Sequence, residues 1–221
     1  MTARRSRVFV VDDHPLVREW LGSLIAREAD LEVCGQTDDA AKALTMLATA
    51  NPDIAVVDLS LSRSSGLALI KDIRLQYPAV RVLVLSMHEE ISYPERAFRA
   101  GARGYILKRE SGSCVIAGIR TVLSGQFYAS QSLAAELAGR MAGAAERNGD
   151  SPDEILSDRE LEVLELRGAG RTAKAIAEHL NVSVKTIESY EARIKQKLGL
   201  QNATELLREG VRWRERNHRN D

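Results

Sequence analysis

Five polar side chains stand at the ends of short apolar runs in the first half of the chain. They are Asp12 and Asp13 after VFVV, Asp58 in IAVVDL, Ser86 at the end of RVLVLS, and Lys108 after GYIL. Three carboxylates that converge repel one another unless a cation lies among them, and Mg²⁺ accepts a few carboxylates while keeping several waters. A lysine would steady an added anion, and a serine hydroxyl would hydrogen-bond it. The combination predicts a cation-dependent pocket for an anionic group.

Short strands that alternate with amphipathic helices would position these residues. Apolar, β-branched runs predict strands at residues 8–11, 31–35, 54–59, 82–86 and 104–107. Helical periodicity predicts helices at residues 16–27, 40–50, 67–76, 93–100 and 112–124. This alternation implies an α/β doubly wound, five-stranded parallel sheet of the flavodoxin-like type. Ligands of such sheets bind at the carboxyl ends of the strands, where the polar residues fall.

The second half of the chain shows no alternation of strand and helix patterns. Residues 130–147 are rich in alanine and predict a partly helical stretch, and the polar ERNGDSPDE that follows is typical of a linker. From Leu156 onward only helix patterns appear, with helix caps at Ser157, Thr172, Ser183 and Asn202. We therefore expect an α/β domain at residues 5–128, a partly helical linker at 129–155 and an all-α domain at 156–221.

Four stretches of the first half, VVDDH, VVDLSLSRSSG, VLVLSMH and GARGYILK, closely resemble the receiver domain of two-component response regulators. The resemblance covers about residues 5–128 and implies that Asp58 is the phosphoacceptor. It further implies that Asp13 and Asp58 hold Mg²⁺ through their side chains. By the same resemblance Asp12 acts through water, and Ser60 acts through its backbone carbonyl.

The resemblance also implies a switch around the phosphoryl group. Lys108 would pair with that group, Ser86 would turn inward after phosphorylation, and Tyr105 would be the aromatic that follows it. The sequence departs from the common receiver pattern at two positions. Ser62 stands where a proline is frequent, and Met87 stands where a small residue is frequent. We expect a looser loop after the phosphoacceptor and a moderated access to it.

The all-α half carries a helix pair at residues 172–180 and 184–198, joined by NVS. In a helix-turn-helix the second helix enters the major groove. The segment from LSDREL to NATEL, about residues 156–210, resembles the LuxR-type output domain of the NarL/FixJ family. That resemblance places Lys185, Glu188 and Ser189 toward base edges, and we expect Lys174 and Arg193 to contact the DNA backbone.

Other residues of this half leave alternatives open. Glu188 and Glu191 bring negative charge toward the groove, where a glutamate can accept from cytosine N4. Lys197 lies late in the same helix, where it would reach phosphates. Leu206, Leu207 and Val211 recur at helical spacing in the last helix; they either pair two output domains or pack the helical core.

The composition narrows the class of protein. A formal net charge of +0 excludes a uniformly basic coat but allows a local basic patch. No apolar run is long enough for a transmembrane helix, so we expect no membrane association and a cytoplasmic protein. Cys34 and Cys114 are expected to be reduced thiols. The four histidines show no metal-ligand spacing along the sequence.

Three functions are compatible with these patterns. The first is a phosphorylation-controlled, DNA-binding transcriptional regulator that is not an enzyme and that dimerises when phosphorylated, with double-stranded DNA and a sensor histidine kinase as partners. The second is a Mg²⁺-dependent phosphohydrolase with an aspartyl-phosphate, for which the haloacid-dehalogenase pattern would require an aspartate where Ser60 stands. The third is a binding module whose receiver serves only as a dimerisation scaffold.

Overall fold

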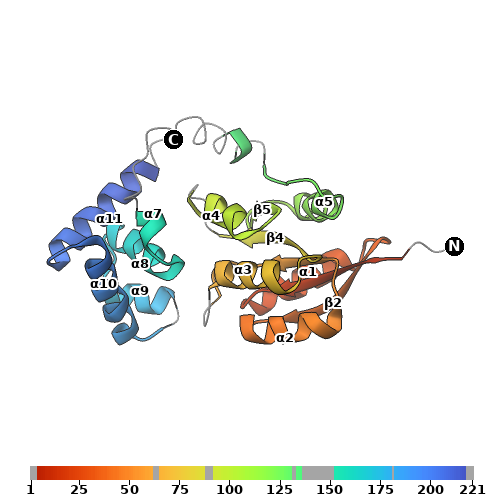
Figure 1. Ribbon diagram of the computed structural model, residues 1–221, viewed down its shortest axis with the longest axis horizontal. Coiled ribbons are helices and arrows are strands. Elements are labelled where there is room, and N and C mark those ends of the chain that lie inside the picture. The colour runs from red at the N-terminus through yellow and green to blue at the C-terminus, as the bar shows by residue number, and fades with distance from the viewer. Residues whose placement is uncertain are drawn as a thin grey trace. The chain divides into compact units, whose positions relative to one another are not determined.

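The chain forms two compact units in the computed structural model, Met1–Ala138 and Gly139–Asp221 (Figure 1). The structure describes residues 4–61, 65–87, 92–130, 133–135, 152–180 and 182–217. Ser62 and most of the alanine-rich stretch predicted to be partly helical lie outside these ranges.

The first unit is built on a five-stranded sheet with the order β2-β1-β3-β4-β5. All neighbouring strands pair in parallel. The strands are β1 (Ser6–Val11), β2 (Leu31–Thr37), β3 (Ile54–Val57), β4 (Arg81–Ser86) and β5 (Gly104–Leu107). The predicted fold class is confirmed. β3 ends two residues earlier than predicted, so Asp58 follows the strand instead of lying in it.

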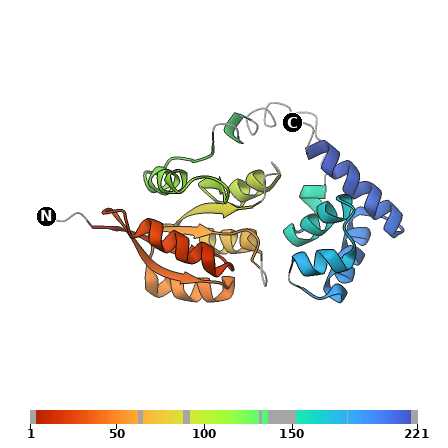
Figure 2. The same cartoon turned by 180° about the vertical axis from the view of Figure 1, so that it is seen from behind.

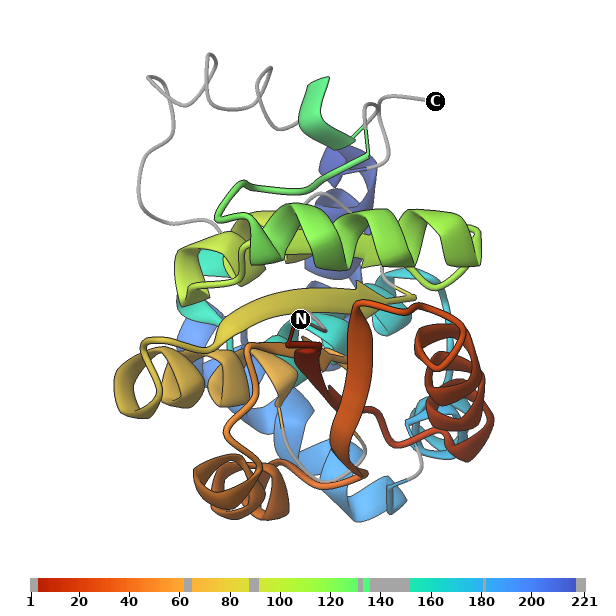
Figure 3. The ribbon, with the colours of Figure 1, turned by 90° about the vertical axis from the view of Figure 1, so that its right-hand side faces the viewer.

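Helices cover both faces of this sheet, as Figure 3 shows. They are α1 (Pro15–Ile25), α2 (Ala40–Ala50), α3 (Gly66–Gln76), α4 (Ser92–Ala100) and α5 (Gly112–Leu123). Side chains alternate along a strand, so Val8 and Val10 pack with α1 and α5, whereas Phe9 and Val11 pack with α2, α3 and α4. This burial on both faces is why the strands read as continuous apolar runs.

The segment after α5 returns to the sheet at β5. The N–H of Tyr128 donates to the carbonyl of Arg103 over 2.9 Å, and its carbonyl accepts from the N–H of Tyr105 over 3.0 Å. The Tyr128 ring fits against Gly118, where an added Cβ would lie 3.2 Å from a ring carbon. The outer edge of β5 is thereby paired at Tyr105.

Helices are the only regular secondary structure among the described residues of the second unit (Figure 2). It contains α7 (Pro152–Ile155), α8 (Asp158–Gly168), α9 (Ala173–His179), α10 (Val184–Leu198) and α11 (Ala203–Asn217). The predicted caps at Thr172, Ser183 and Asn202 accept hydrogen bonds from the N–H groups of Ala175, Thr186 and Glu205, and Ser157 forms a capping box with Glu160. α7 lies within the range predicted as linker, because Ile155 and Leu156 pack into the core of this unit.

Two glycines let α8 and α11 approach closely. A Cβ added at Gly168 would lie 2.3 Å from the backbone carbonyl of Gly210. Next to this crossing, the Trp213 Nε1–H donates to the Glu165 carboxylate over 2.9 Å in the buried interior. The crossing fixes α11 against α8.

The three apolar residues of α11, which the sequence assigned either to the helical core or to pairing of two output domains, differ in burial. Leu206 is buried in the core, as expected from core packing. Leu207 and Val211 remain 45% and 38% exposed, so they do not fill that core. Separately, every helix within the described ranges is too short or too polar to cross a membrane.

Candidate phosphorylation pocket and DNA-reading helix

The carboxyl ends of β1, β3 and β5 bring together two aspartates and a lysine. Asp12 and Asp58 are each 1% exposed. The Nζ of Lys108 lies 2.6 Å from Asp58 Oδ2 and 2.8 Å from Asp12 Oδ2. Three residues that are far apart in the sequence thus form one buried charge cluster, at the sheet edge that the sequence predicted.

This cluster carries an excess of negative charge. Burial, opposed only in part by the Lys108 ammonium and reinforced by the Asp12 carboxylate, holds the pKa of Asp58 above its ordinary value. Burial by itself would lower the pKa of Lys108, but the Asp58 and Asp12 carboxylates outweigh it and raise that pKa. The raised pKa of Asp58 and the raised pKa of Lys108 both show that the cluster favours additional positive charge. This is expected where two carboxylates share one ammonium.

Asp13 and Ser60 complete the set of predicted ligands. The Ser60 N–H donates to Asp58 Oδ1 over 3.2 Å, which places the Ser60 backbone beside that carboxylate. One ligand atom from each of Asp12, Asp13, His14 and Asp58 can be chosen so that all four lie within 4.8 Å of one another. The oxygen donors are the hard ligands that Mg²⁺ prefers, so the residues fit this ion.

The two predicted switch residues are fully buried. Ser86 is the last residue of β4, and its carbonyl accepts from the Lys108 N–H over 2.8 Å. The Tyr105 ring lies in the core beneath α4, together with Tyr93 and Ala97. The ring thus already has the inward position that the receiver resemblance implies for the phosphorylated state.

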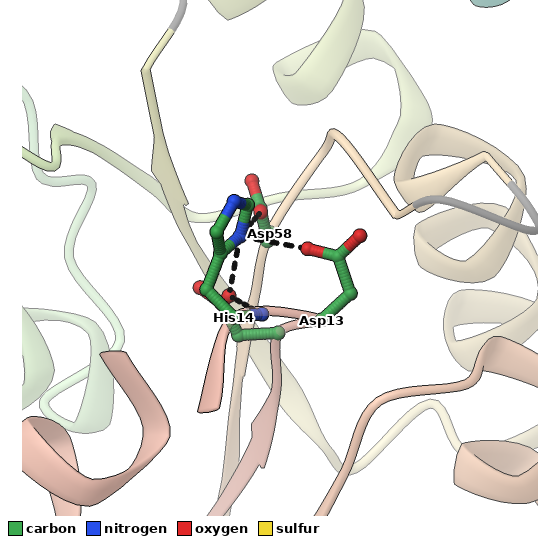
Figure 4. Close-up of side chains that lie close together, drawn as sticks. Asp13, His14 and Asp58 are labelled. Atoms are coloured by element: carbon green, nitrogen blue, oxygen red, sulfur yellow. Dashed lines mark hydrogen bonds and ion pairs between the residues drawn. The ribbon is translucent and has the colours of Figure 1, made fainter. Parts of the chain in front are cut away.

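Sequence reasoning missed two residues of this pocket. The Nδ1 of His14 lies 2.7 Å from Asp13 Oδ1 (Figure 4), and spacing among the histidines could not reveal this contact because its partners are aspartates. Gly66 begins α3, and a Cβ there would lie 2.2 Å from the Asp58 carbonyl oxygen. The adjacency DDH and the final glycine of SRSSG were the available signals.

The predicted DNA-contacting residues of α10 share one face. Lys185, Glu188, Ser189 and Arg193 are exposed, whereas Ile187 and Ile194 are fully buried. The Ser189 hydroxyl donates to the Lys185 carbonyl over 2.9 Å, so its lone pairs remain available to accept hydrogen bonds. Lys174 is exposed on the neighbouring helix α9. The four α10 residues therefore lie on one accessible face of that helix.

Two charged residues of α10 are paired within the unit. Glu191 does not point toward a groove, because the Arg167 guanidinium of α8 binds it at 2.7 Å. Lys197 is paired as well, since its Nζ lies 2.6 Å from the buried Glu160 carboxylate, and its side chain is 39% exposed. Val184 was overlooked: it is 41% exposed at the start of α10, beside Lys185.

Comparisons with known proteins agree with both units. The family described as "Response regulator receiver domain" matches residues 8–120. The family described as "Bacterial regulatory proteins, luxR family" matches residues 154–209. The oxygen regulatory protein NreC of Staphylococcus aureus is 34% identical over 205 residues, which make up 91% of this chain and 94% of that protein.

Solved structures are similar as well. A LuxR-family two-component response regulator from Aurantimonas sp. SI85-9A1 is 33% identical, with a TM-score of 0.59, over 62% of this chain and 99% of that one. The Salmonella typhimurium RcsB response regulator, whose structure was described for its conformational dynamism in DNA interaction, is 26% identical with a TM-score of 0.59, over 94% of this chain and 98% of that one. Since both families match in order and the similarity to NreC spans nearly the whole chain, this protein belongs to the NarL/FixJ family of two-component response regulators and is a phosphorylation-regulated, DNA-binding transcriptional regulator.

Proposed function

We propose that Asp58 accepts the phosphoryl group, from a sensor histidine kinase or from a small phosphodonor. The observation that carries this proposal is the 2.6 Å contact between Lys108 Nζ and Asp58 Oδ2 at the carboxyl end of the sheet. Lys108 holds one oxygen of the nucleophilic carboxylate, and the Ser60 N–H holds the other. Once a phosphoryl oxygen arrives, the same ammonium pairs with it and offsets part of its negative charge.

Mg²⁺ fits the oxygen donors of this pocket. We assign its ligands to the side chains of Asp13 and Asp58, to Asp12 through water and to the Ser60 carbonyl. When bound, the ion neutralises carboxylates and polarises the phosphoryl oxygens.

Ser86 is the moving part of the proposed switch, and Tyr105, which is already inward, is the fixed aromatic on the paired strand. The Ser86 hydroxyl bonds the phosphoryl group, and the buried Tyr105 ring keeps its inward position once Ser86 has moved. The supporting observation is that the two residues lie on adjacent paired strands, with Tyr105 opposite Val84 and Ser86 opposite Leu107. Phosphorylation therefore stabilises one arrangement of β4 and β5, and through it we expect homodimerisation and tighter DNA binding.

The exposed face of α10 is the proposed base-reading surface. Lys185 suits guanine acceptors, Glu188 suits the cytosine amine, and the Val184 methyl groups suit the thymine methyl. Glu188 has no ion-pair or hydrogen-bond partner among the described residues, unlike Glu191. We assign Arg193 and Lys174 to contacts with the DNA backbone, which would fix the register of the helix.

A hydrolase is the weaker alternative. Ser60 stands two residues after Asp58, so the pocket lacks the second carboxylate that a haloacid-dehalogenase-type hydrolase would use. We propose that the chain is not an enzyme and that it works in the cytoplasm, where its target DNA and the kinase's catalytic portion lie.

Incubation with acetyl phosphate and Mg²⁺ tests the phosphoacceptor. The wild-type chain should gain the mass of one phosphoryl group, and Asp58→Asn should gain none. Asp38→Asn is the matched control, since Asp38 is an exposed carboxylate on the loop before α2. Full labelling of Asp58→Asn would refute the assignment.

Sedimentation and DNA binding with a beryllofluoride mimic test the coupling of the two units. We expect the mimic to raise both self-association and DNA affinity of the full chain. If it changes neither, the receiver is only a scaffold and the third of the initial functions is correct.

A further inference from the structure

The imidazole of His14 has an unusual place for a residue at a helix start. His14 is the N-cap of α1, yet its side chain makes no capping hydrogen bond. Instead its Nδ1 lies 2.7 Å from Asp13 Oδ1 and 4.0 Å from Asp58 Oδ2 (Figure 4). The same nitrogen lies 3.3 Å from Asp12 Oδ1. The side chain is 61% exposed, so core packing does not force it into this position.

A nitrogen donor changes the ion preference of a carboxylate site. Imidazole binds first-row transition ions well, whereas Mg²⁺ prefers oxygen ligands and keeps its waters. In this pocket one nitrogen and three carboxylates can present four donors within 4.8 Å of one another. The excess negative charge around Asp58 already favours a divalent cation.

We propose that His14 makes this pocket a mixed nitrogen–oxygen site that selects Mn²⁺ and Zn²⁺ over Mg²⁺. The Nδ1 of His14 supplies the nitrogen, and the carboxylates of Asp13, Asp12 and Asp58 supply the oxygens. The inference uses the carboxylates of the proposed phosphorylation pocket and in that respect rests on the proposed function.

The test is a titration of the full chain with Mn²⁺, followed by the electron paramagnetic resonance signal of free Mn²⁺. Competition with Mg²⁺ and with Zn²⁺ gives the other two affinities. His14→Gln should weaken Mn²⁺ and Zn²⁺ binding by at least about tenfold and should change the ratio of Mn²⁺ to Mg²⁺ affinity by a similar factor. His179→Gln, an exposed histidine on α9, is the matched control and should change nothing.

A second readout detects the metal–nitrogen bond directly. Electron spin-echo modulation of bound Mn²⁺ reports a directly coordinated nitrogen, and we expect the imidazole signal in the wild-type chain and its loss in His14→Gln. Absence of that signal in the wild-type chain overturns the proposal, as does an equal weakening of Mn²⁺ and Mg²⁺ binding by His14→Gln. Neither result touches the phosphoacceptor, which the Asp58→Asn labelling decides independently.

Discussion

The charges of the receiver pocket and those of α10 are organised in opposite ways. In the pocket, Asp12, Asp58 and Lys108 are buried and lie within 2.8 Å of a partner. On α10, Lys185 and Glu188 are exposed, and neither has an ion-pair partner among the described residues. Buried charges must be compensated where they stand, whereas solvent screens exposed charges until a ligand arrives. Mutations in the first region should therefore change stability, and those in the second should change recognition.

The largest expected effect comes from removing the buried ammonium. Lys108→Met leaves two carboxylates facing each other, so we expect the free energy of unfolding of the receiver to fall by about 3 kcal/mol without divalent cation. Adding Mg²⁺ should recover part of the loss, because a cation replaces the missing charge. The free energy of unfolding of the receiver is measured by urea titration, with Trp20 fluorescence as the signal in a Trp213→Phe background.

An exposed lysine of the same unit provides the control for that experiment. Lys42 lies 3.8 Å from Asp38, and both side chains are largely exposed. Lys42→Met should cost less than about 0.5 kcal/mol. If Lys42→Met and Lys108→Met lowered the free energy of unfolding equally, burial could not explain the effect of Lys108→Met.

The scaffold beneath the recognition face should be almost as sensitive as the pocket. Gly168→Ala places a Cβ 2.3 Å from the Gly210 carbonyl. We expect the output unit to lose about 3 kcal/mol, measured through Trp213 fluorescence in a Trp20→Phe background. Gly22→Ala is the control, since a Cβ there meets no atom within 4 Å; it should stabilise α1 by up to about 1 kcal/mol.

Substitutions on the exposed face of α10 should change the affinity for DNA but not the stability of the output unit. Lys185→Ala should reduce discrimination at one base position by about 1–3 kcal/mol, and Arg193→Ala should weaken binding to all sequences alike. Both should leave the free energy of unfolding within about 0.5 kcal/mol of the wild type. Fluorescence anisotropy with operator and random DNA, at several salt concentrations, measures them. Two variants that behave alike on both DNAs would contradict the assigned face.

The smallest effect concerns Glu160, a buried carboxylate whose partner, Lys197, is partly exposed. Burial acts to raise its pKa, but the Lys197 ion pair and the Ser157 hydrogen bonds outweigh burial and hold the pKa below its ordinary 4.5. The stability that follows is fully present above pH 4.5 and is lost as pH falls through the folded-state value. Glu160→Gln should flatten the pH dependence of the output unit, by about 1 kcal/mol. An unchanged acid profile for Glu160→Gln in a Trp20→Phe background would show that the ion pair is not stabilising.

The sequence predicts those features that depend on local patterns. The succession of strands and helices could be inferred because the apolar runs, their spacing and the polar residues after them are all local signals. The caps at Thr172, Ser183 and Asn202 followed from single residues beside periodic segments. The convergence of Asp12, Asp58 and Lys108 followed from the parallel topology.

Long-range pairing between side chains was not predictable in the same way. Glu191 looked like a groove residue because its helical position allows it, and only the fold brings Arg167 to it. The place of His14 depends on a side-chain rotation over the loop before α1, which spacing along the sequence does not encode. Gly66 and Gly168 likewise matter only because another backbone approaches them.

The pairing of Tyr128 with β5 restricts how a partner protein can recognise the switch strand. An edge strand with free N–H and carbonyl groups invites an incoming strand to extend the sheet. Here the Tyr105 amide is already bonded to the Tyr128 carbonyl, within the same chain. A partner that senses β5 must therefore read side chains there, unless it first displaces the start of the connecting segment.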